Sequence, residues 1–211
     1  MTARDQTLQH FLDLTETAIL LGADSCDGAK PAATRIFTAL RNKVGPRSGA
    51  KPESLPVCSV LEEALRISGK AMAPIPELAT TLAKLSPGLA WHRRQGAELE
   101  SPSFFDGHAN AYLAGPVGVE IRSDVWIGIS LMAPHVRYPN HRHPPEEIYV
   151  SLAGGDWKKE QHWHRPKPGG LIYNEPNVLH AMATDEEPLL AIWCLWVGDE
   201  QDSGQAGKIT S

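Results

Sequence analysis

In the N-terminal part of the chain, apolar residues recur at helical spacing. Apolar positions repeat near intervals of three and four within residues 5–21 and 36–44, which places them on one face of a helix. The same spacing predicts a third helix around residues 57–65 and a fourth around residues 78–85, where preceding prolines suit a helix start. Residues 1–88 are therefore expected to form a helical segment that packs on the rest of the protein.

After Pro87 the pattern changes to short runs rich in Val, Ile, Trp and Tyr, separated by Gly and Pro. The expected strands are residues 110–113, 117–121, 125–133, 147–153, 161–165, 170–173 and 189–197. Many short strands bounded by turn signals indicate an antiparallel sandwich or barrel. We expect a mainly β barrel over residues 89–198, and a flexible tail at 199–211 because that stretch is polar and contains Gly and Ser.

Composition excludes several classes of partner. The formal net charge is -5 with acidic and basic residues interspersed, whereas a nucleic-acid-binding protein normally carries a basic stripe. No run approaches the roughly 18 apolar residues of a membrane span. The three cysteines are unclustered, which argues against a secreted disulfide framework and favours the reducing cytoplasm. The oligomeric state stays open, with a homodimer as one arrangement.

One cluster of residues has the spacing of a metal site. His141, His143 and Glu147 are followed by His180, and borderline divalent cations bind neutral imidazole and anionic carboxylate together. On one extended strand, odd-numbered residues from His141 through Tyr149 would share a face. Asn177 stands where a turn with positive φ would help to present His180, since asparagine tolerates that conformation.

Any one of these histidines is better interpreted as a surface or packing residue, but the complete set favours a metal site. His135, His162 and His164 have no partner at ligand spacing, so we exclude them as ligands. Three imidazoles and one carboxylate accommodate iron, manganese, zinc, cobalt or nickel, and the sequence does not choose among these metals.

Residues 141–147 with Gly154 resemble the first conserved motif of the cupins, and residues 169–180 resemble the second, with Asn177 in place of a glycine. This resemblance implies a single cupin barrel, a jelly roll also called a double-stranded β-helix, preceded here by an α-helical segment. It also implies that His141, His143, Glu147 and His180 bind one divalent transition metal ion.

A closer resemblance is to the cupin-type dimethylsulfoniopropionate lyases. It is carried by residues 128–134, 138–143, 146–149 and 155–157, and upstream by Trp91 and the turn at 114–116. What it implies is cleavage of dimethylsulfoniopropionate to dimethyl sulfide and acrylate by removal of a proton and β-elimination. In that family, tyrosines that match Tyr149 and Tyr138 are tied to the active site, and one of them is the base.

We favour Tyr149 as the base, because it lies two residues beyond the ligand Glu147, and keep Tyr138 as the alternative. Aromatic faces attract cations such as the sulfonium of the substrate. Among the six tryptophans, Trp193, Trp196 and Trp91 are the candidates for substrate binding; Trp193 and Trp196 occupy opposite faces of one strand. Two rival functions remain: a non-catalytic small-molecule-binding cupin, and an iron-dependent dioxygenase or isomerase on the same scaffold.

Overall fold

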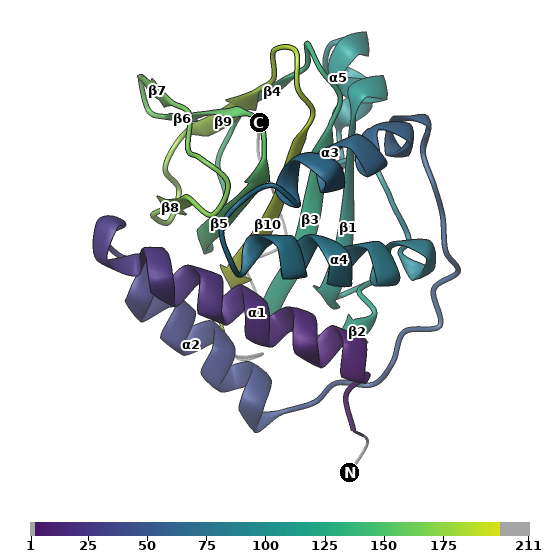
Figure 1. Cartoon of the computed structure of the whole chain (residues 1–211), viewed down its shortest axis with the longest axis vertical. Helices are drawn as coiled ribbons and strands as arrows, with labels where there is room; N and C mark the ends of the chain where they lie inside the picture. The colour runs from purple at the N-terminus through teal and green to yellow at the C-terminus, as the bar shows by residue number, and fades with distance from the viewer. Residues whose placement is uncertain (1–2, 199–211) are drawn as a thin grey trace.

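The computed structural model describes residues 3–198, so the tail predicted at 199–211 lies outside the described residues. Five α-helices occur in this part of the chain (Figure 1): α1 Gln6–Gly22, α2 Ala29–Asn42, α3 Leu61–Ser68, α4 Ile75–Leu85 and α5 Pro102–Gly107. The first four are the helices that the apolar spacing predicts. Asp5 caps α1 by accepting hydrogen bonds from the backbone N–H groups of Thr7 and Leu8, which a helix start would otherwise leave unpaired.

The remaining chain forms two sheets that face each other. The strands are β1 His108–Gly115, β2 Glu120–Ile121, β3 Val125–Met132, β4 Arg137–His141, β5 Glu146–Ala153, β6 Asp156–Lys159, β7 His162–His164, β8 Leu171–Asn174, β9 His180–Ala183 and β10 Leu189–Trp196. One sheet has the order β2-β1-β3-β10-β5-β8, and the other has the order β4-β9-β6-β7. Neighbouring strands are antiparallel except for β1 and β2.

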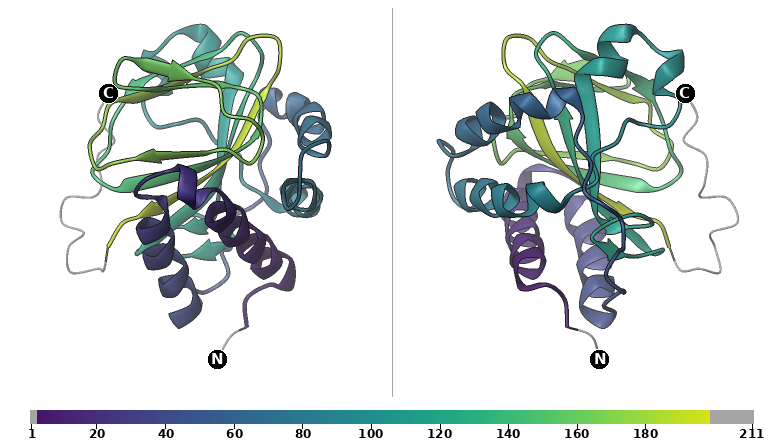
Figure 2. Two further views of the ribbon diagram at one scale, coloured as in Figure 1. Left: turned by 60° about the vertical axis from the view of Figure 1, so that its left-hand side comes forward. Right: turned by 90° about the vertical axis from the view of Figure 1, so that its right-hand side faces the viewer.

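The six-stranded sheet is covered on both faces, so the protein has three layers. Helices α1 to α4 lie against its outer face (Figure 2), and the four-stranded sheet lies on its other side. Along β3, Ile127 and Ile129 belong to the hydrophobic core beneath the helices, whereas Met132 belongs to the core between the sheets. Because neighbours along a strand point to opposite faces, this alternation divides each long strand into a helix-facing set and a barrel-facing set.

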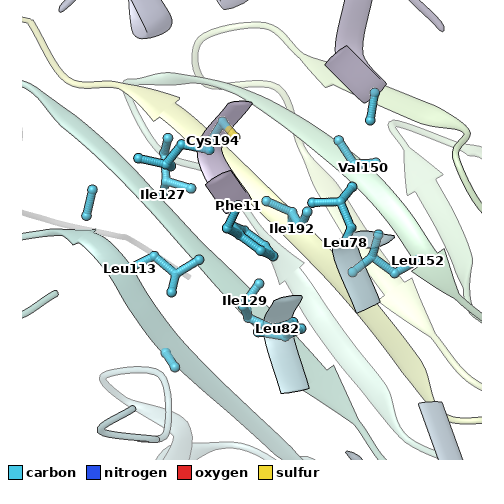
Figure 3. Packing of buried hydrophobic residues seen from close by; sticks show 14 of the residues in the cluster. Phe11, Leu78, Leu82, Leu113, Ile127, Ile129, Val150, Leu152, Ile192 and Cys194 are labelled. Carbon is cyan, nitrogen blue, oxygen red and sulfur yellow. The ribbon is translucent and has the colours of Figure 1, made fainter. Parts of the chain in front are cut away.

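The helices cover the sheet and not the barrel interior. Phe11 of α1 and Leu82 of α4 meet the sheet residues Ile129 and Ile192 in one buried cluster (Figure 3). No residue of α1 to α4 lines the cavity described below, so the helices reach that site only through the sheet that they support.

Phe11 offers a direct test of this packing. Replacing Phe11 with alanine is expected to lower the free energy of unfolding by about 3–5 kcal/mol, because the side chain is fully buried and its removal leaves a cavity. The matched control is Leu21→Ala on the same helix, where the side chain is 70% exposed; its effect should stay within about 0.5 kcal/mol. Urea unfolding of both variants measures the difference, and equal effects would show that α1 does not pack as described.

Three strands and one helix were not anticipated from the sequence. Strands β4 and β6 carry mostly polar or charged residues, and β9 has only four residues, so none of them shows the longer apolar runs used to find strands. Helix α5 has only six residues, too few for a repeat at helical spacing. The strand expected over 117–121 is limited to Glu120–Ile121.

The expectation that a single extended strand carries His141, His143, Glu147 and Tyr149 was wrong. His141 ends β4 in one sheet, while Glu147 and Tyr149 belong to β5 in the other. The chain turns between them at Pro144 and Pro145, where proline cannot donate the hydrogen bonds that continue a strand. The residues still meet, because the turn brings the two sheets together at this end of the barrel.

Within the described residues, none of the helices combines the length and the apolar character that a membrane crossing requires.

Candidate metal centre and its cavity

The three predicted histidine ligands converge between the two sheets. One nitrogen from each of His141, His143 and His180 lies within 4.8 Å of the others, and all three side chains are buried. His141 and His180 are opposite each other in the pairing of β4 with β9, which sets their imidazole centroids 4.0 Å apart. The pairing of these two short strands therefore builds half of the cluster.

Glu147 joins the cluster from the facing sheet. Its Oε2 atom lies 3.2 Å from Nε2 of His143 and 3.4 Å from Nε2 of His180. Asn174 on the adjacent strand β8 donates from Nδ2 to the same Oε2 atom at 3.1 Å. The carboxylate is thereby oriented toward the imidazoles by a neighbour whose own position is fixed by the sheet.

Backbone carbonyls fix the orientation of every imidazole in the cluster. The Nδ1 atoms of His141, His143 and His180 contact the carbonyl oxygens of Pro139, Pro145 and Val178 at 2.9, 2.8 and 2.9 Å. A carbonyl accepts only, so each Nδ1 carries the proton and each Nε2 keeps its lone pair. This is the arrangement that metal-binding histidines use, in which the second nitrogen is held by an outer hydrogen bond.

Asn177 shapes the turn before His180 as the sequence predicted. Its φ angle is 62°, in the left-handed region that asparagine tolerates. Its backbone N–H donates to the carbonyl oxygen of His143 at 2.9 Å. The turn that leads to one histidine is thus tied to the backbone of another.

The protonation states of His141 and Glu147 suit cation binding; burial would lower the pKa of His143, but its contact with Glu147 outweighs burial and raises it. Burial, aided by the nearby His180, holds the pKa of His141 well below its usual value, which keeps that imidazole neutral. Burial alone would raise the pKa of Glu147, but its contacts with His143 and His180 outweigh burial and hold the pKa well below the usual value. A neutral nitrogen and an ionised oxygen are the forms that ligate metals.

These residues fit a divalent metal ion. The donor set is three imidazole nitrogens and one carboxylate oxygen, and Nε2 of His180 is buried with no hydrogen-bond partner among the described residues. A buried polar atom without a partner is uncommon in folded proteins, and it is expected where a ligand atom awaits a cation. Imidazole and carboxylate together do not select one transition metal, so the chemistry leaves the identity of the ion open.

A cavity of about 310 Å³ opens beside this cluster inside the barrel. Its lining includes His141, His143, Glu147 and both predicted tyrosines, Tyr138 and Tyr149. A cavity of this size fits a small ligand, since pockets for drug-sized molecules start at about 300 Å³. The structure therefore brings three of the predicted ligands and both predicted bases to one cavity, with His180 in the cluster beside it.

The two tyrosines differ in their surroundings. Tyr149 hydrogen-bonds with Glu147, and burial together with that carboxylate raises the pKa of its phenol well above the ordinary value. Burial also raises the pKa of Tyr138, although the positive charge of Arg94 opposes the increase. Tyr149 is thus beside the carboxylate of the cluster, Glu147, whereas Tyr138 lies against one of its imidazoles, His141, with ring centroids 4.6 Å apart.

Of the three predicted tryptophans, the structure places one in the cavity. Trp193 lines it and packs edge-on to Tyr112, with ring centroids 4.9 Å apart. Gly128 on β3 makes room for the indole, because a Cβ atom there would lie 2.2 Å from the ring. Trp91 and Trp196 lie instead against the core beneath the helices, on the other face of the sheet.

Sequence reasoning missed several residues of the cavity wall. Tyr112 and Trp126 line the cavity beside Trp193, and their rings are perpendicular at a centroid distance of 6.0 Å. Arg94 and Asn110 also line it. The sequence does contain a signal for Asn110 and Tyr112, because they alternate with the small buried residues of β1 and so lie on its other face. Which face lines a cavity became clear only from the pairing of β1 with β3 in the structure.

Comparisons with known proteins place these residues in a family context. The family model for dimethylsulfoniopropionate lyase matches residues 29–191 of the chain. A putative dimethylsulfoniopropionate lyase, DddL, from Cereibacter sphaeroides is 31% identical over 163 residues, which cover 76% of this chain and 67% of that protein. The dimethylsulfoniopropionate lyase DddQ from Ruegeria pomeroyi is 28% identical over 173 residues, which cover 81% of this chain and 84% of that protein.

Solved structures agree on the fold. The crystal structure of the lyase DddQ from Ruegeria pomeroyi superposes with a TM-score of 0.70 at 23% identity and covers 94% of each chain. A second crystal structure, from a study of the lyases RdDddP and RnDddQII, superposes with a TM-score of 0.68 at 20% identity and covers 93% of this chain and 95% of its own. The predicted fold class, a mainly β cupin barrel with an N-terminal helical segment, is confirmed.

Proposed function

This chain belongs to the dimethylsulfoniopropionate lyase family, a family of carbon–sulfur lyases, and from that premise we propose that it cleaves dimethylsulfoniopropionate into dimethyl sulfide and acrylate. One observation carries the proposal for this chain's own site. His141, His143 and Glu147 line one cavity of small-molecule size together with Tyr138 and Tyr149, and His180 completes the cluster beside it. A β-elimination next to a carboxylate uses a base for the proton and a positive charge for the carboxylate, and these groups can supply both.

The reaction is difficult because the proton that must be removed from the substrate is only weakly acidic. The proton to be removed is on the carbon beside a carboxylate, and its removal adds a second negative charge to an anionic group. His141, His143, Glu147 and His180 would hold the divalent cation. When bound, that ion supplies a Lewis acid for carboxylate oxygen and a positive charge that favours the ionised form of a nearby phenol.

Tyr149 is the base in our proposal. Its phenolate oxygen takes the proton from the carbon next to the carboxylate, and the carbon–hydrogen electrons form the double bond of acrylate. The carbon–sulfur bond breaks with its electron pair on sulfur, so neutral dimethyl sulfide leaves. Support comes from the position of Tyr149 in the cavity beside Glu147; burial and that carboxylate raise the pKa of the phenol, so ionisation at neutral pH would depend on the positive charge of the bound cation. Tyr138, against Asn110 and Arg94, is the alternative base.

The aromatic wall of the cavity suits the other end of the substrate. Tyr112, Trp126 and Trp193 form an edge-to-face cluster, so their rings present π-faces in different directions. A sulfonium within about 6 Å of such a face is attracted by about 0.5–2 kcal/mol. An aromatic wall also accepts the methyl groups of the departing dimethyl sulfide without requiring hydrogen bonds from it.

Trp193 is expected to matter for substrate affinity and Trp196 is not. Replacing Trp193 with leucine should raise KM for dimethylsulfoniopropionate by about threefold to thirtyfold through the loss of a cation–π contact. Trp196→Leu is the matched control, three residues along the same strand but outside the cavity lining, and its KM should stay within about twofold of the parent value. A larger rise for the Trp196 variant would place the sulfonium elsewhere.

The function is tested by the products. Purified protein incubated with dimethylsulfoniopropionate should release dimethyl sulfide and acrylate in equal amounts, at equal rates in air and under nitrogen. An oxygenase on this scaffold would stop without oxygen. A binding protein would retain the substrate and release neither product, and that result would refute the proposal.

A further inference from the structure

Arg94 is a buried cation in the wall of the cavity. Its side chain is 5% exposed, and its Nη2 atom forms an ion pair with Glu100 at 2.9 Å. Its Nε atom is also buried but has no hydrogen-bond partner among the described residues. Guanidinium groups at buried positions normally pair their donors, because an unpaired charged donor loses its hydration without compensation. The Nε–H group of Arg94 therefore lacks an acceptor among the described residues, and the residue lines the cavity.

The backbone of Arg94 is held in place by a buried histidine. The Arg94 N–H donates to Nε2 of His108 at 2.9 Å, and Nδ1 of His108 bonds to the carbonyl oxygen of Phe104. Burial lowers the pKa of His108 to about 4, so its imidazole is neutral and its Nε2 can accept. The rings of His108 and Phe104 stack with centroids 3.8 Å apart. Arg94 lies in a loop, and its backbone is thus fixed there by a buried side chain.

The guanidinium lies near the metal centre. Its Cζ atom is 5.4 Å from the centroid of the Tyr138 ring, and that ring in turn contacts His141. Among the residues that line the cavity, the only other guanidinium is that of Arg93. Arg93 differs because its Nε donates to the carbonyl oxygen of Phe105 at 2.6 Å and its side chain is 26% exposed.

We propose that Arg94 is the carboxylate-recognition residue of this cavity, with Nε–H donating to one carboxylate oxygen of a short-chain monocarboxylate. The identity of that ligand as dimethylsulfoniopropionate or acrylate rests on the proposed function; the anion site itself rests on Arg94. A charge-assisted hydrogen bond is stronger than a neutral one. With the aromatic cluster of Tyr112, Trp126 and Trp193 in the same cavity, a zwitterion would be oriented with its anion and its cation toward different parts of the wall.

The test compares acrylate with acrylamide, which has the same shape without the charge. Ligand-observed NMR on the full-length zinc-loaded protein measures both dissociation constants, since zinc is diamagnetic. The protein should bind acrylate at least about tenfold more tightly than acrylamide. In Arg94→Gln, acrylate affinity should fall by about tenfold while acrylamide affinity stays within about twofold, so the preference for acrylate should narrow by several-fold and any part that the zinc ion supplies remains.

Arg93→Gln is the matched control, because it removes the same charge from the neighbouring position; its preference for acrylate should stay within about twofold of the parent. Arg94→Lys keeps the charge without the Nε–H donor and should bind acrylate with intermediate affinity. Circular dichroism and thermal unfolding establish that each variant is folded. Equal preference in the parent protein, or an unchanged preference in a folded Arg94→Gln, would overturn the inference.

The experiments distinguish a failure of the proposed lyase function from a failure of the proposed anion site at Arg94. If acrylate binding depends on Arg94 but no dimethyl sulfide is released from dimethylsulfoniopropionate, the lyase function is wrong and the anion site stands. If dimethyl sulfide is released and Arg94→Gln keeps its preference for acrylate, the anion site is wrong and the lyase function stands.

Discussion

Tyr149→Phe should reduce the rate of dimethyl sulfide release by about 10²–10⁴-fold, the range that general acid–base groups contribute. The phenylalanine ring keeps the shape of a fully buried side chain that packs against Trp157, with ring centroids 4.6 Å apart, so the fold should persist. Only the hydroxyl group is lost. Headspace gas chromatography with saturating substrate measures the rate, and metal content should be unchanged.

Tyr138→Phe is the comparison that identifies the base. Tyr138 lines the same cavity and is also buried, but its ring lies against the imidazole of His141, and its surroundings include Asn110 and Arg94. Its removal should cost less than the removal of the Tyr149 hydroxyl group. If Tyr138→Phe abolished release while Tyr149→Phe kept most of it, the assignment of the base would have to be reversed.

His180→Ala should remove both bound metal and activity. The imidazole is buried, its Nδ1–H is fixed on the carbonyl oxygen of Val178, and its Nε2 points at the cluster. Loss of residues that merely support a ligand costs about 10–100-fold in metal affinity or activity, so loss of a ligand should cost more than that. Elemental analysis after dialysis measures the metal, and product release measures the activity.

His164→Ala is the control for this prediction. His164 is an exposed histidine on β7 that does not line the cavity, so its replacement should leave metal content and activity at parent values. If His180→Ala retained stoichiometric metal with parent affinity, the proposed ligand set would be incorrect.

The helical segment could be predicted from the sequence because its signal is local. Apolar spacing found α1 through α4, and the polar position of Asp5 suits the cap that it forms. Strands β4 and β9 show no comparable apolar pattern in the sequence, because they are only five and four residues long and each includes a histidine of the cluster. Their pairing depends on contacts between segments far apart in the chain.

The candidate ligands could be named from their types and spacing, but their geometry could not. The sequence spacing predicts His141 and Glu147 on one strand. In the structure the chain turns at the two prolines between them, so the two residues belong to different sheets. Asn177 was predictable, since its positive φ is a local property of the turn. The place of Arg94 in the cavity wall could not be predicted, because the residues next to it in the sequence do not indicate that it is buried beside Tyr138.

If this protein is a metal-dependent lyase with Tyr149 as its base, release of dimethyl sulfide requires both the bound metal and the Tyr149 hydroxyl group. Protein stripped with a chelator is reconstituted separately with iron, manganese, zinc, cobalt and nickel, and dimethyl sulfide release is followed for the parent protein and for Tyr149→Phe at equal metal content. We predict that the stripped protein is inactive, that at least one metal restores release, and that Tyr149→Phe stays inactive with every metal. Full release from the stripped protein would show that the metal is not required, and full release from metal-loaded Tyr149→Phe would show that Tyr149 is not the base.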